Sequence, residues 1–406
     1  MPHAGPVVDP SRVSARTPLW SVLVLTWLCS LTSGTVVNGV YFVAKSAYGF
    51  GAVDNLLLGL ALGAAYIPGA LLIGPALRRL ARRVPWLTTR DVLLAMVVVM
   101  GAVGAVPVLM RGSAWVIWPV VAVLSAMYGA QWPIVESYLS GGRRGDTLRR
   151  AVGSFNICWA SAIVAASLLM APLIEKHPLE ILLITGVVQA GSAIFLRWFA
   201  PYPARHVEES HPHPPVYERL LAVFRWLLPA SYVLLYCLAP MLPDITAGLG
   251  VHLSWATLLA GTWALSRVGA FTLFSYWGGW HGRWRTPIWT TAALLVGFGL
   301  CVTASTVPAL IGGLALFGVG LGGIYSAALY YAMEVGAAEV DAGGVHEALI
   351  GVGYSVGPLL GLSGIGVARA FSGESVTSQG ATLALACALV GLAVVVAWRA
   401  ARRVDA

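Results

Sequence analysis

The sequence predicts an all-α polytopic membrane protein in which twelve transmembrane helices form two six-helix bundles. Three observations lead to this prediction. Apolar runs of membrane-spanning length recur along the 406 residues, the arginines gather in every second loop, and one proline-rich segment divides the chain near its middle. The composition agrees, because 58% of the residues are hydrophobic and only 10% carry a charge. Core helices of a soluble protein would be shorter and would be apolar on one face alone.

Each apolar run is expected to form one helix that crosses the membrane. A helix rises ~1.5 Å per residue and needs ~20 apolar residues to cross a hydrocarbon core of ~30 Å, within which every backbone polar group must be paired. In chain order the runs are Leu19–Val43, Asn55–Leu77, Val92–Leu109, Ala114–Leu139, Ala151–Ile174, Leu179–Ala200, Leu220–Leu242, Leu253–Trp277, Ile288–Val307, Leu310–Met333, Ala348–Ala368 and Ala381–Trp398. Little more than Pro308 divides the ninth run from the tenth, so eleven or thirteen crossings stay open, although the charges favour an even number.

The arginines indicate how these helices are oriented. The N-terminus and every second loop after it hold Arg12, Arg16, Arg78, Arg79, Arg82, Arg83, Arg90, Arg143, Arg144, Arg149, Arg150, Arg197, Arg205, Arg219, Arg225, Arg283, Arg285, Arg399, Arg402 and Arg403. The loops on the other side hold only Lys45, Arg111, Lys176 and Arg369. Positive residues mark the cytoplasmic side of a membrane protein. We therefore expect both termini to be cytoplasmic, in a multi-pass protein of the bacterial inner (plasma) membrane.

The largest polar interruption is the proline-rich segment 201–217, which is predicted to link the two bundles. His206, His211 and His213 lie in it, but no acidic residue or cysteine completes a metal site, so a solvated loop is the better interpretation and no metal or other cofactor is predicted. The predicted organisation is a cytoplasmic N-terminal tail (1–18), an N-terminal bundle (19–200), a cytoplasmic linker (201–217), a C-terminal bundle (218–399) and a C-terminal tail (400–406).

Several classes of protein are excluded by composition and motifs. The net charge of +8 does not indicate a nucleic-acid partner, because the arginines lie in short loops beside apolar runs. The five cysteines all fall inside apolar runs, so neither a disulfide framework nor a metal site is expected. The sequence holds no Walker loop, so ATP is not expected to drive this protein directly.

The two halves of the chain carry similar motifs. The fourth run ends near Glu136 and the tenth, six runs later, ends near Glu334. The second and eighth runs are each followed by a loop of glycines and arginines, the first of which is Gly-Pro-Ala-Leu-Arg-Arg-Leu-Ala-Arg-Arg (74–83).

With these motifs the chain resembles the major facilitator superfamily over nearly its whole length. Gly74, Arg79, Arg82 and Arg83 match that family's motif after the second helix, whereas Arg78 stands where the family has an aspartate. The resemblance implies a transporter that is not driven by ATP. It would move a small organic solute by rocking two bundles about a central site, so alternating access is expected. The subfamily is not assigned.

Arg267 is the foremost candidate for binding the solute. It lies deep inside the eighth run, where a charge is costly unless it faces a cavity or a partner. A guanidinium presents a planar fork of donors that suits a carboxylate or phosphate, so a polar or anionic metabolite is one expectation, and a structural arginine is the other. The resemblance places further candidates in cavity-lining helices, namely Asn38, Gln131, Trp132, Asn156, Trp159, Tyr325 and Tyr330.

Glu136 and Glu334 are predicted to be gating residues. In the resembled fold Glu136 would pair with Arg79, Arg82 or Arg143, and Glu334 with Arg283 or Arg285, when the cytoplasmic side closes. A permanent tie inside one bundle is an equal alternative. Proton coupling is possible but has no obvious carrier, because no carboxylate stands at clear midplane depth, so facilitated diffusion and anion exchange stay open.

Two other classes of function are kept. A membrane-embedded enzyme would need a polar cluster at one membrane face, and Glu339, Asp341, His346 and Glu347 are the only comparable residues. A non-transporting sensor with the same fold would carry an added signalling domain. The expected partners are a small-molecule substrate, the lipid bilayer and, unproven, a proton. We expect the protein to act as a monomer and not as an enzyme, while its substrate, direction and coupling ion remain open.

Overall fold

The computed structural model describes residues 16–143, 145–204, 213–335, 340–371 and 377–403, and every regular element in these residues is a helix. The first half holds α1 (Leu19–Gly34), η1 (Thr35–Gly39), α2 (Val40–Tyr48), α3 (Ala52–Arg83), α4 (Thr89–Leu109), η2 (Ala114–Val116), α5 (Ile117–Ser140), α6 (Gly145–Met170), α7 (Pro178–Gly191) and η3 (Ser192–Trp198). The second half holds α8 (Val216–Gly248), α9 (Leu253–Ala260), α10 (Thr262–Tyr276), η4 (Gly278–Trp280), α11 (Arg285–Val302), α12 (Val307–Val335), α13 (Val340–Ala370) and α14 (Ser378–Arg403).

These elements make twelve crossings, as the apolar runs predict. Eleven helical segments of the described chain are each long and apolar enough to span a membrane. The eighth crossing is the exception, because Gly261 breaks it into α9 and α10, neither of which is long enough alone. The first crossing is continuous but contains the π-helical turn η1 between α1 and α2. An all-helical, polytopic membrane fold is therefore confirmed.

The helix boundaries follow local sequence signals. Thr88 caps α4 in a reciprocal arrangement, because its hydroxyl accepts a hydrogen bond from the backbone N–H of Asp91 (3.3 Å) while the Asp91 carboxylate accepts one from the backbone N–H of Thr88 (3.0 Å). Gly49 ends α2 with φ of 72°, a left-handed conformation that glycine adopts without strain. The prolines inside α3 and α8 did not end those helices.

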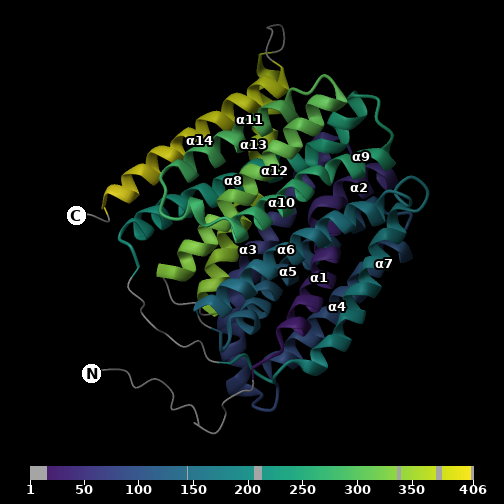
Figure 1. Cartoon of the computed structure of the whole chain (residues 1–406). Helices are drawn as coiled ribbons and strands as arrows, with labels where there is room; N and C mark the ends of the chain where they lie inside the picture. Colours follow the sequence, from purple (N-terminus) through teal and green to yellow (C-terminus); the bar gives the residue numbers. More distant parts are fainter. Residues whose placement is uncertain (1–15, 144, 205–212, 336–339, 372–376, 404–406) are drawn as a thin grey trace.

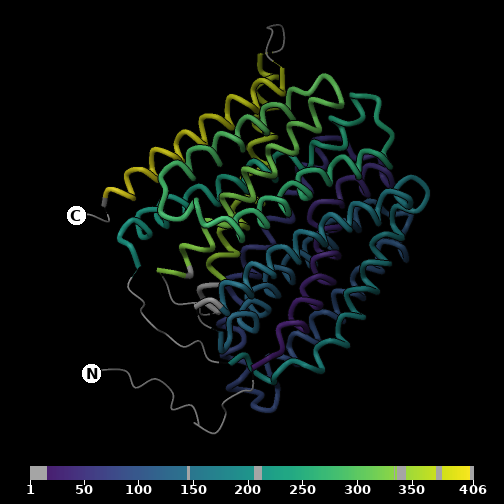
Figure 2. Tube along the Cα trace, in the orientation of Figure 1, coloured from purple at the N-terminus to yellow at the C-terminus, as the bar shows by residue number. Residues whose placement is uncertain are grey.

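The two halves of the chain lie side by side as two bundles (Figure 1). Helices α1, α4 and α7 flank one side of the molecule, whereas α11 and α14 flank the other. In Figure 2 the purple-to-blue half of the trace and the green-to-yellow half occupy these two sides. The bundles meet along two seams, where α3 packs on α13 and α6 packs on α10. Throughout, the terminal face is the one at which α1 begins and α14 ends, and the opposite face is the other.

Small residues allow the close approach at the first of these seams. A Cβ atom built on Gly63 of α3 would lie 2.4 Å from the backbone carbonyl carbon of Tyr354 on α13. One turn earlier, a Cβ atom on Gly59 would lie 3.0 Å from the ring of Pro358. Glycines four residues apart let two helix backbones approach closely inside a membrane. The seam between α3 and α13 therefore depends on both glycines.

Charged pairs join the bundles at both faces. On the opposite face, the Lys45 ammonium at the end of the first crossing donates to the Asp244 carboxylate of α8. On the terminal face, the guanidinium of Arg149 on α6 lies 3.5 Å from the carboxylate of Glu334 on α12. The bundles are therefore tied at both ends, with the candidate site between them.

Candidate functional site

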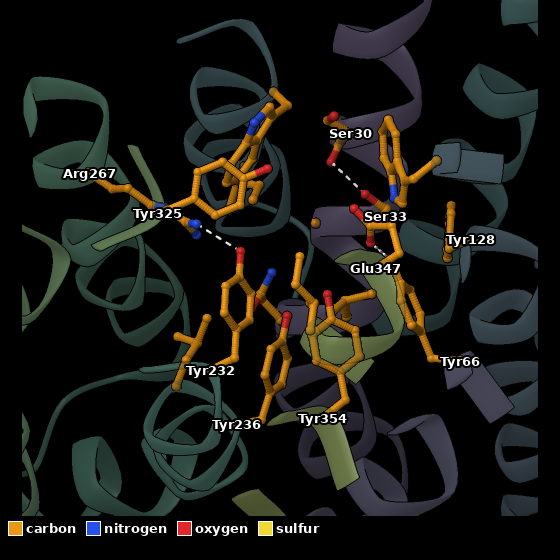
Figure 3. Close-up of a pocket in the computed structure, with 18 of the residues that line it drawn as sticks. Ser30, Ser33, Tyr66, Tyr128, Tyr232, Tyr236, Arg267, Tyr325, Glu347 and Tyr354 are labelled. Carbon is orange, nitrogen blue, oxygen red and sulfur yellow. Dashed lines mark hydrogen bonds between the residues drawn. The ribbon is translucent and has the colours of Figure 1, made fainter. Parts of the chain in front are cut away.

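A cavity of ≈ 80 Å³ lies between the two bundles and is lined by both of them (Figure 3). Helices α1, α3, α5 and α6 line it from the first half, and α8, α10, α12 and α13 line it from the second. Ten of the 21 lining residues are aromatic, and Figure 3 shows Tyr232, Tyr236 and Tyr354 along one wall. The cavity has room for several water molecules in this conformation.

Arg267 lies at one end of this cavity, as its position in the eighth run predicts. Its side chain is only 1% exposed, and its Nη2 donates a hydrogen bond of 2.8 Å to the hydroxyl of Tyr232. Its Nε has no hydrogen-bond partner in the described structure. A close contact positions α10 on α12, because a Cβ atom on Gly322 would lie 3.2 Å from the Cγ of Arg267. The guanidinium is thus held in place, and its Nε–H donor remains unpaired.

Aromatic rings surround the guanidinium of Arg267. Its central carbon lies 4.4 Å from the ring centroid of Trp159, 5.0 Å from that of Tyr325 and 5.2 Å from that of Phe271. Each such cation–π contact contributes roughly 0.5–2 kcal/mol. No salt bridge joins Arg267 to a carboxylate among the residues that the structure describes. The rings offset part of the cost of burying the charge and leave it available to an anion.

The far end of the same cavity is acidic. The carboxyl groups of Glu136 on α5 and Glu347 on α13 are hydrogen bonded to each other. The hydroxyl of Tyr66 on α3 donates a further hydrogen bond to Glu347. Figure 3 shows Arg267 on one side of the pocket and Glu347 with Tyr66 on the other. The site therefore holds a buried cation at one end and two adjoining carboxyl groups at the other.

This geometry corrects the pairing expected for Glu136. Its partner is Glu347, and it lines the central cavity instead of meeting Arg79, Arg82 or Arg143. The difference arises from the orientation of α5 about its own axis, which directs Glu136 towards the central cavity. Arg79 and Arg82 lie on an exposed stretch of α3.

The other expected gate pairs also differ from the observed contacts. Arg143 is buried and donates to the backbone carbonyls of Tyr138 (2.9 Å), Leu139 (2.5 Å) and Thr17 (2.8 Å), so it ties the end of α5 to the segment before α1. Burial lowers the pKa of Arg143 to about 10, which leaves it charged at neutral pH.

Glu334 meets Arg149 of the other bundle in place of Arg283 or Arg285, both of which are exposed. Glu334 therefore does pair with an arginine across the two bundles at the terminal face, but that arginine is Arg149 of α6.

The candidate binding residues divide into two groups. Asn38, Trp132, Trp159 and Tyr325 line the central cavity together with Arg267, and the Asn38 Oδ1 atom has no hydrogen-bond partner in the described structure. Three others lie elsewhere, namely Gln131, Asn156 and Tyr330.

The residues outside the cavity have other contacts. Gln131 accepts a hydrogen bond of 3.0 Å from Gln189 within the first bundle. Asn156 accepts one of 3.2 Å from the indole N–H of Trp159, so it orients a ring that does line the cavity. Tyr330 stacks on His281 at a centroid distance of 4.4 Å, at the terminal face.

Sequence reasoning missed other cavity residues, among them Tyr66, Tyr232, Tyr236, Glu347 and Tyr354. One signal was available, because Tyr232 and Tyr236 are one helical turn apart and Glu347 and Tyr354 are two turns apart, so each pair shares a helix face. Glu347 belongs to the cluster considered for a membrane enzyme. Of that cluster, Glu339 and the side chain of Asp341 lie outside the described residues, and Glu347 faces the cavity.

A larger groove of ≈ 640 Å³ lies nearer the terminal face and is called the vestibule below. Its lining includes Arg149, Asn156, Phe271, His281 and Tyr330, from both bundles. Burial and the positive charge of Arg149 lower the pKa of His281, so this ring is neutral at physiological pH. On the other side of the central cavity, towards the opposite face, the pocket is only ≈ 20 Å³. In this conformation the space beside the site is therefore larger towards the terminal face.

Three rings separate the central cavity from the vestibule. Trp159 lies 5.4 Å from Phe271 and 5.4 Å from Tyr325, and Phe271 lies 5.6 Å from Tyr325, all between ring centroids. Trp159 and Tyr325 line the cavity, whereas Phe271 lines the vestibule. Trp159 belongs to one bundle and the other two rings to the second, so the layer spans the interface between the bundles.

Removing one ring of this layer is expected to join the two spaces. In a background without native cysteines, a cysteine at Ser33 in the central cavity should react faster with a thiol reagent when Phe271→Ala is added, on the order of tenfold, because less local opening is then needed. Phe195→Ala is the matched control, since Phe195 stacks on Trp198 away from the cavity (5.9 Å). Equal labelling rates in both variants would show that the rings do not limit access.

Comparison with solved structures finds the same fold in known transporters. The nucleoside transporter NupG is 14% identical, with a TM-score of 0.63, and the match covers 94% of this chain and 98% of that one. A variant of NupG gives 12% identity and a TM-score of 0.64 over the same shares. The human organic anion transporter MFSD10 (TETRAN) is 14% identical, with a TM-score of 0.58, and the match covers 94% of this chain and 99% of that one.

These likenesses confirm the predicted fold over nearly the whole chain. At such low identity they do so for the fold alone, and the site must be judged by its own residues. No protein-family model matches the sequence, and a search of curated proteins finds no relative.

Proposed function

We propose that this protein is a secondary transporter that carries a small organic anion across the membrane by alternating access. Its two bundles would rock about the central cavity, and the substrate would bind to Arg267. The single observation that carries the proposal is a guanidinium that is 1% exposed, faces a cavity between the bundles and keeps an unpartnered Nε.

The donor set favours an anion with a planar oxygen pair. Nη2 of Arg267 is held by Tyr232, while Nε stays unpaired, so a carboxylate can approach along the free edge of the guanidinium. The cavity wall adds the rings of Trp132, Trp159 and Trp263. Flat aromatic walls with a few polar groups suit an aromatic or other apolar body attached to that anionic group.

The arrangement of spaces supports alternating access. The vestibule is large, the pocket towards the opposite face is small, and the site lies between them. Charged pairs tie the bundles together at both faces and can break in turn. By the arginine distribution we place the terminal face in the cytoplasm. In this conformation the larger space beside the site is therefore on the cytoplasmic side. That the similar solved structures are transporters favours transport over an enzyme.

The proposal is tested with pairs of probes that differ in charge alone. Binding of benzoate against benzamide, and of nicotinate against nicotinamide, is measured on the purified protein through the fluorescence of the cavity tryptophans. We expect each anion to bind about 10–100-fold more tightly than its amide, because a charge-assisted hydrogen bond contributes about 1.5–3 kcal/mol.

A nucleoside probe separates the alternatives. Uridine is neutral and of similar size, and NupG is a nucleoside transporter. Tight binding of uridine with no preference for either carboxylate would overturn the anion assignment. Binding of none of the probes, followed by no uptake of a wider panel of organic anions into proteoliposomes, would argue against transport of an organic anion altogether.

A further inference from the structure

We propose that Glu136 and Glu347 form a proton-binding pair that is coupled to the anion at Arg267, so that the protein is a proton–anion symporter. The inference rests on the proposed function, because it names the coupling ion of the same site. It differs from the role expected from the sequence, where Glu136 was a gate residue paired with an arginine.

The first step is the chemistry of the pair itself. An ionised carboxylate can only accept hydrogen bonds. Glu136 and Glu347 line the same cavity and lie close enough for their carboxyl groups to share a hydrogen bond, which requires a proton on one of them. The hydroxyl of Tyr66 supplies a second donor to Glu347. We therefore assign one shared proton to the pair, which can take a second or lose the first.

The second step is where the two carboxyl groups come from. Glu136 belongs to α5 of the first bundle and Glu347 to α13 of the second, and both line the central cavity. A rocking motion that parts the bundles moves the two groups apart and breaks their shared hydrogen bond. Exchange of the proton is thereby linked to the same motion that exposes the substrate.

The third step is the balance of charge in the cavity. Arg267 stands opposite the pair, and its unpartnered Nε, on a side chain that is 1% exposed, indicates an anionic ligand in the same space. The other titratable groups that line the cavity beside the pair are phenols, namely Tyr66 on α3, Tyr128 on α5, Tyr232 and Tyr236 on α8, Tyr325 on α12 and Tyr354 on α13. The ring of His346 on α13 lies 5.9 Å from that of Tyr325, between centroids.

These charges predict the sign of the coupling. With one proton on the pair, its single negative charge balances Arg267. An arriving anion adds a second negative charge to the same dry cavity, where it repels the carboxylate and favours uptake of another proton. By linkage, protonation of the pair strengthens anion binding by the same factor. A monovalent anion and one proton would then cross together without net charge.

The coupling is tested by counting protons when benzoate binds. In weakly buffered solution containing a pH indicator, wild-type protein is expected to take up close to one proton per bound benzoate. Raising the pH through the range where the pair loses its proton should weaken benzoate binding about tenfold, a typical coupling between sites.

Two variants make the test specific. The double variant Glu136→Gln/Glu347→Gln keeps a donor and an acceptor at each position but leaves no carboxyl group to ionise, so binding should no longer depend on pH and proton uptake should vanish. Glu180→Gln is the matched control, because that carboxylate pairs with Arg111 at the opposite face (2.8 Å) and should leave both readouts unchanged. Binding of benzoate with neither proton uptake nor pH dependence would overturn the coupling and leave the anion transporter standing.

A second measurement needs no ligand. Infrared difference spectra across a pH titration separate a protonated carboxyl group from a carboxylate. We expect a protonated carboxyl band at neutral pH that titrates in wild type and in Glu180→Gln, and that is missing in the double variant Glu136→Gln/Glu347→Gln. If no probe binds, the proposed function fails while this band still supports the proton-binding pair. A band that persists in the double variant, or none in wild type, would refute the pair.

Discussion

The variant Arg267→Gln is expected to bind a carboxylate probe at least ~100-fold more weakly than wild type, because it loses two charge-assisted hydrogen bonds that contribute about 1.5–3 kcal/mol each. The protein should still fold. Arg267 is buried among rings and makes no salt bridge in the described structure, and the negative charge of the Glu136–Glu347 pair across the cavity can be neutralised by a second proton when the arginine is removed. Size-exclusion elution and thermal unfolding measure folding, and tryptophan fluorescence measures binding of benzoate.

Two further variants separate the guanidinium fork from simple charge. Arg267→Lys keeps the charge but loses the planar fork, so we expect a loss of about tenfold, the equivalent of one hydrogen bond. Arg197→Gln is the matched control, because Arg197 also lies over a tryptophan, Trp198, at 3.7 Å, but on an exposed part of the first bundle. Unchanged binding of benzoate in Arg267→Gln would remove this residue from the site and, with it, the proposed substrate class.

The fold was predictable because membrane crossing imposes a strong constraint on sequence. Backbone groups in hydrocarbon must be paired within one helix, so each crossing appears as an apolar run of nearly fixed length. The run around Arg267 was recognised in this way, although the break at Gly261 that divides α9 from α10 was not. A single glycine inside an apolar run carries too weak a signal, since many glycines in this chain continue their helices.

The site was predictable only in part, because it depends on which helix faces meet. Arg267 could be identified from its own position, since a charge deep in an apolar run needs a polar environment. The partner of Glu136 could not. Glu347 lies more than 200 residues further along the chain, and the pairing follows from the phase of α5 against α13 in the packed bundles. Sequence periodicity shows which residues share one face of a helix, but it does not show which other helix packs against that face.

The close seam between α3 and α13 explains how these faces are brought together, and it leads to the second large effect. Gly63→Ala is expected to force the two helices apart and to depopulate the present conformation. The added Cβ atom would lie 2.4 Å from the backbone carbonyl carbon of Tyr354 and 2.5 Å from the backbone nitrogen of Ser355. Backbone atoms cannot rotate away as a side chain could. Overpacking of this kind costs about 1–3 kcal/mol, which shifts a two-state population by roughly 5–150-fold.

The shift is measured as a distance between the bundles. Spin labels on cysteines at Arg82 of α3 and Val345 of α13, both exposed near the terminal face, report the separation of the helices. Gly63→Ala should move the main distance to longer values. Gly366→Ala, on α13 itself, is the matched control, because no atom lies within 4 Å of its added Cβ. Since Glu347 lies on α13 and Tyr66 on α3, the same change should weaken their hydrogen bond and reduce coupling between proton and anion. An unaltered distance distribution in Gly63→Ala would mean that α3 and α13 accommodate the added methyl group without moving apart, and that the two glycines do not determine the conformation.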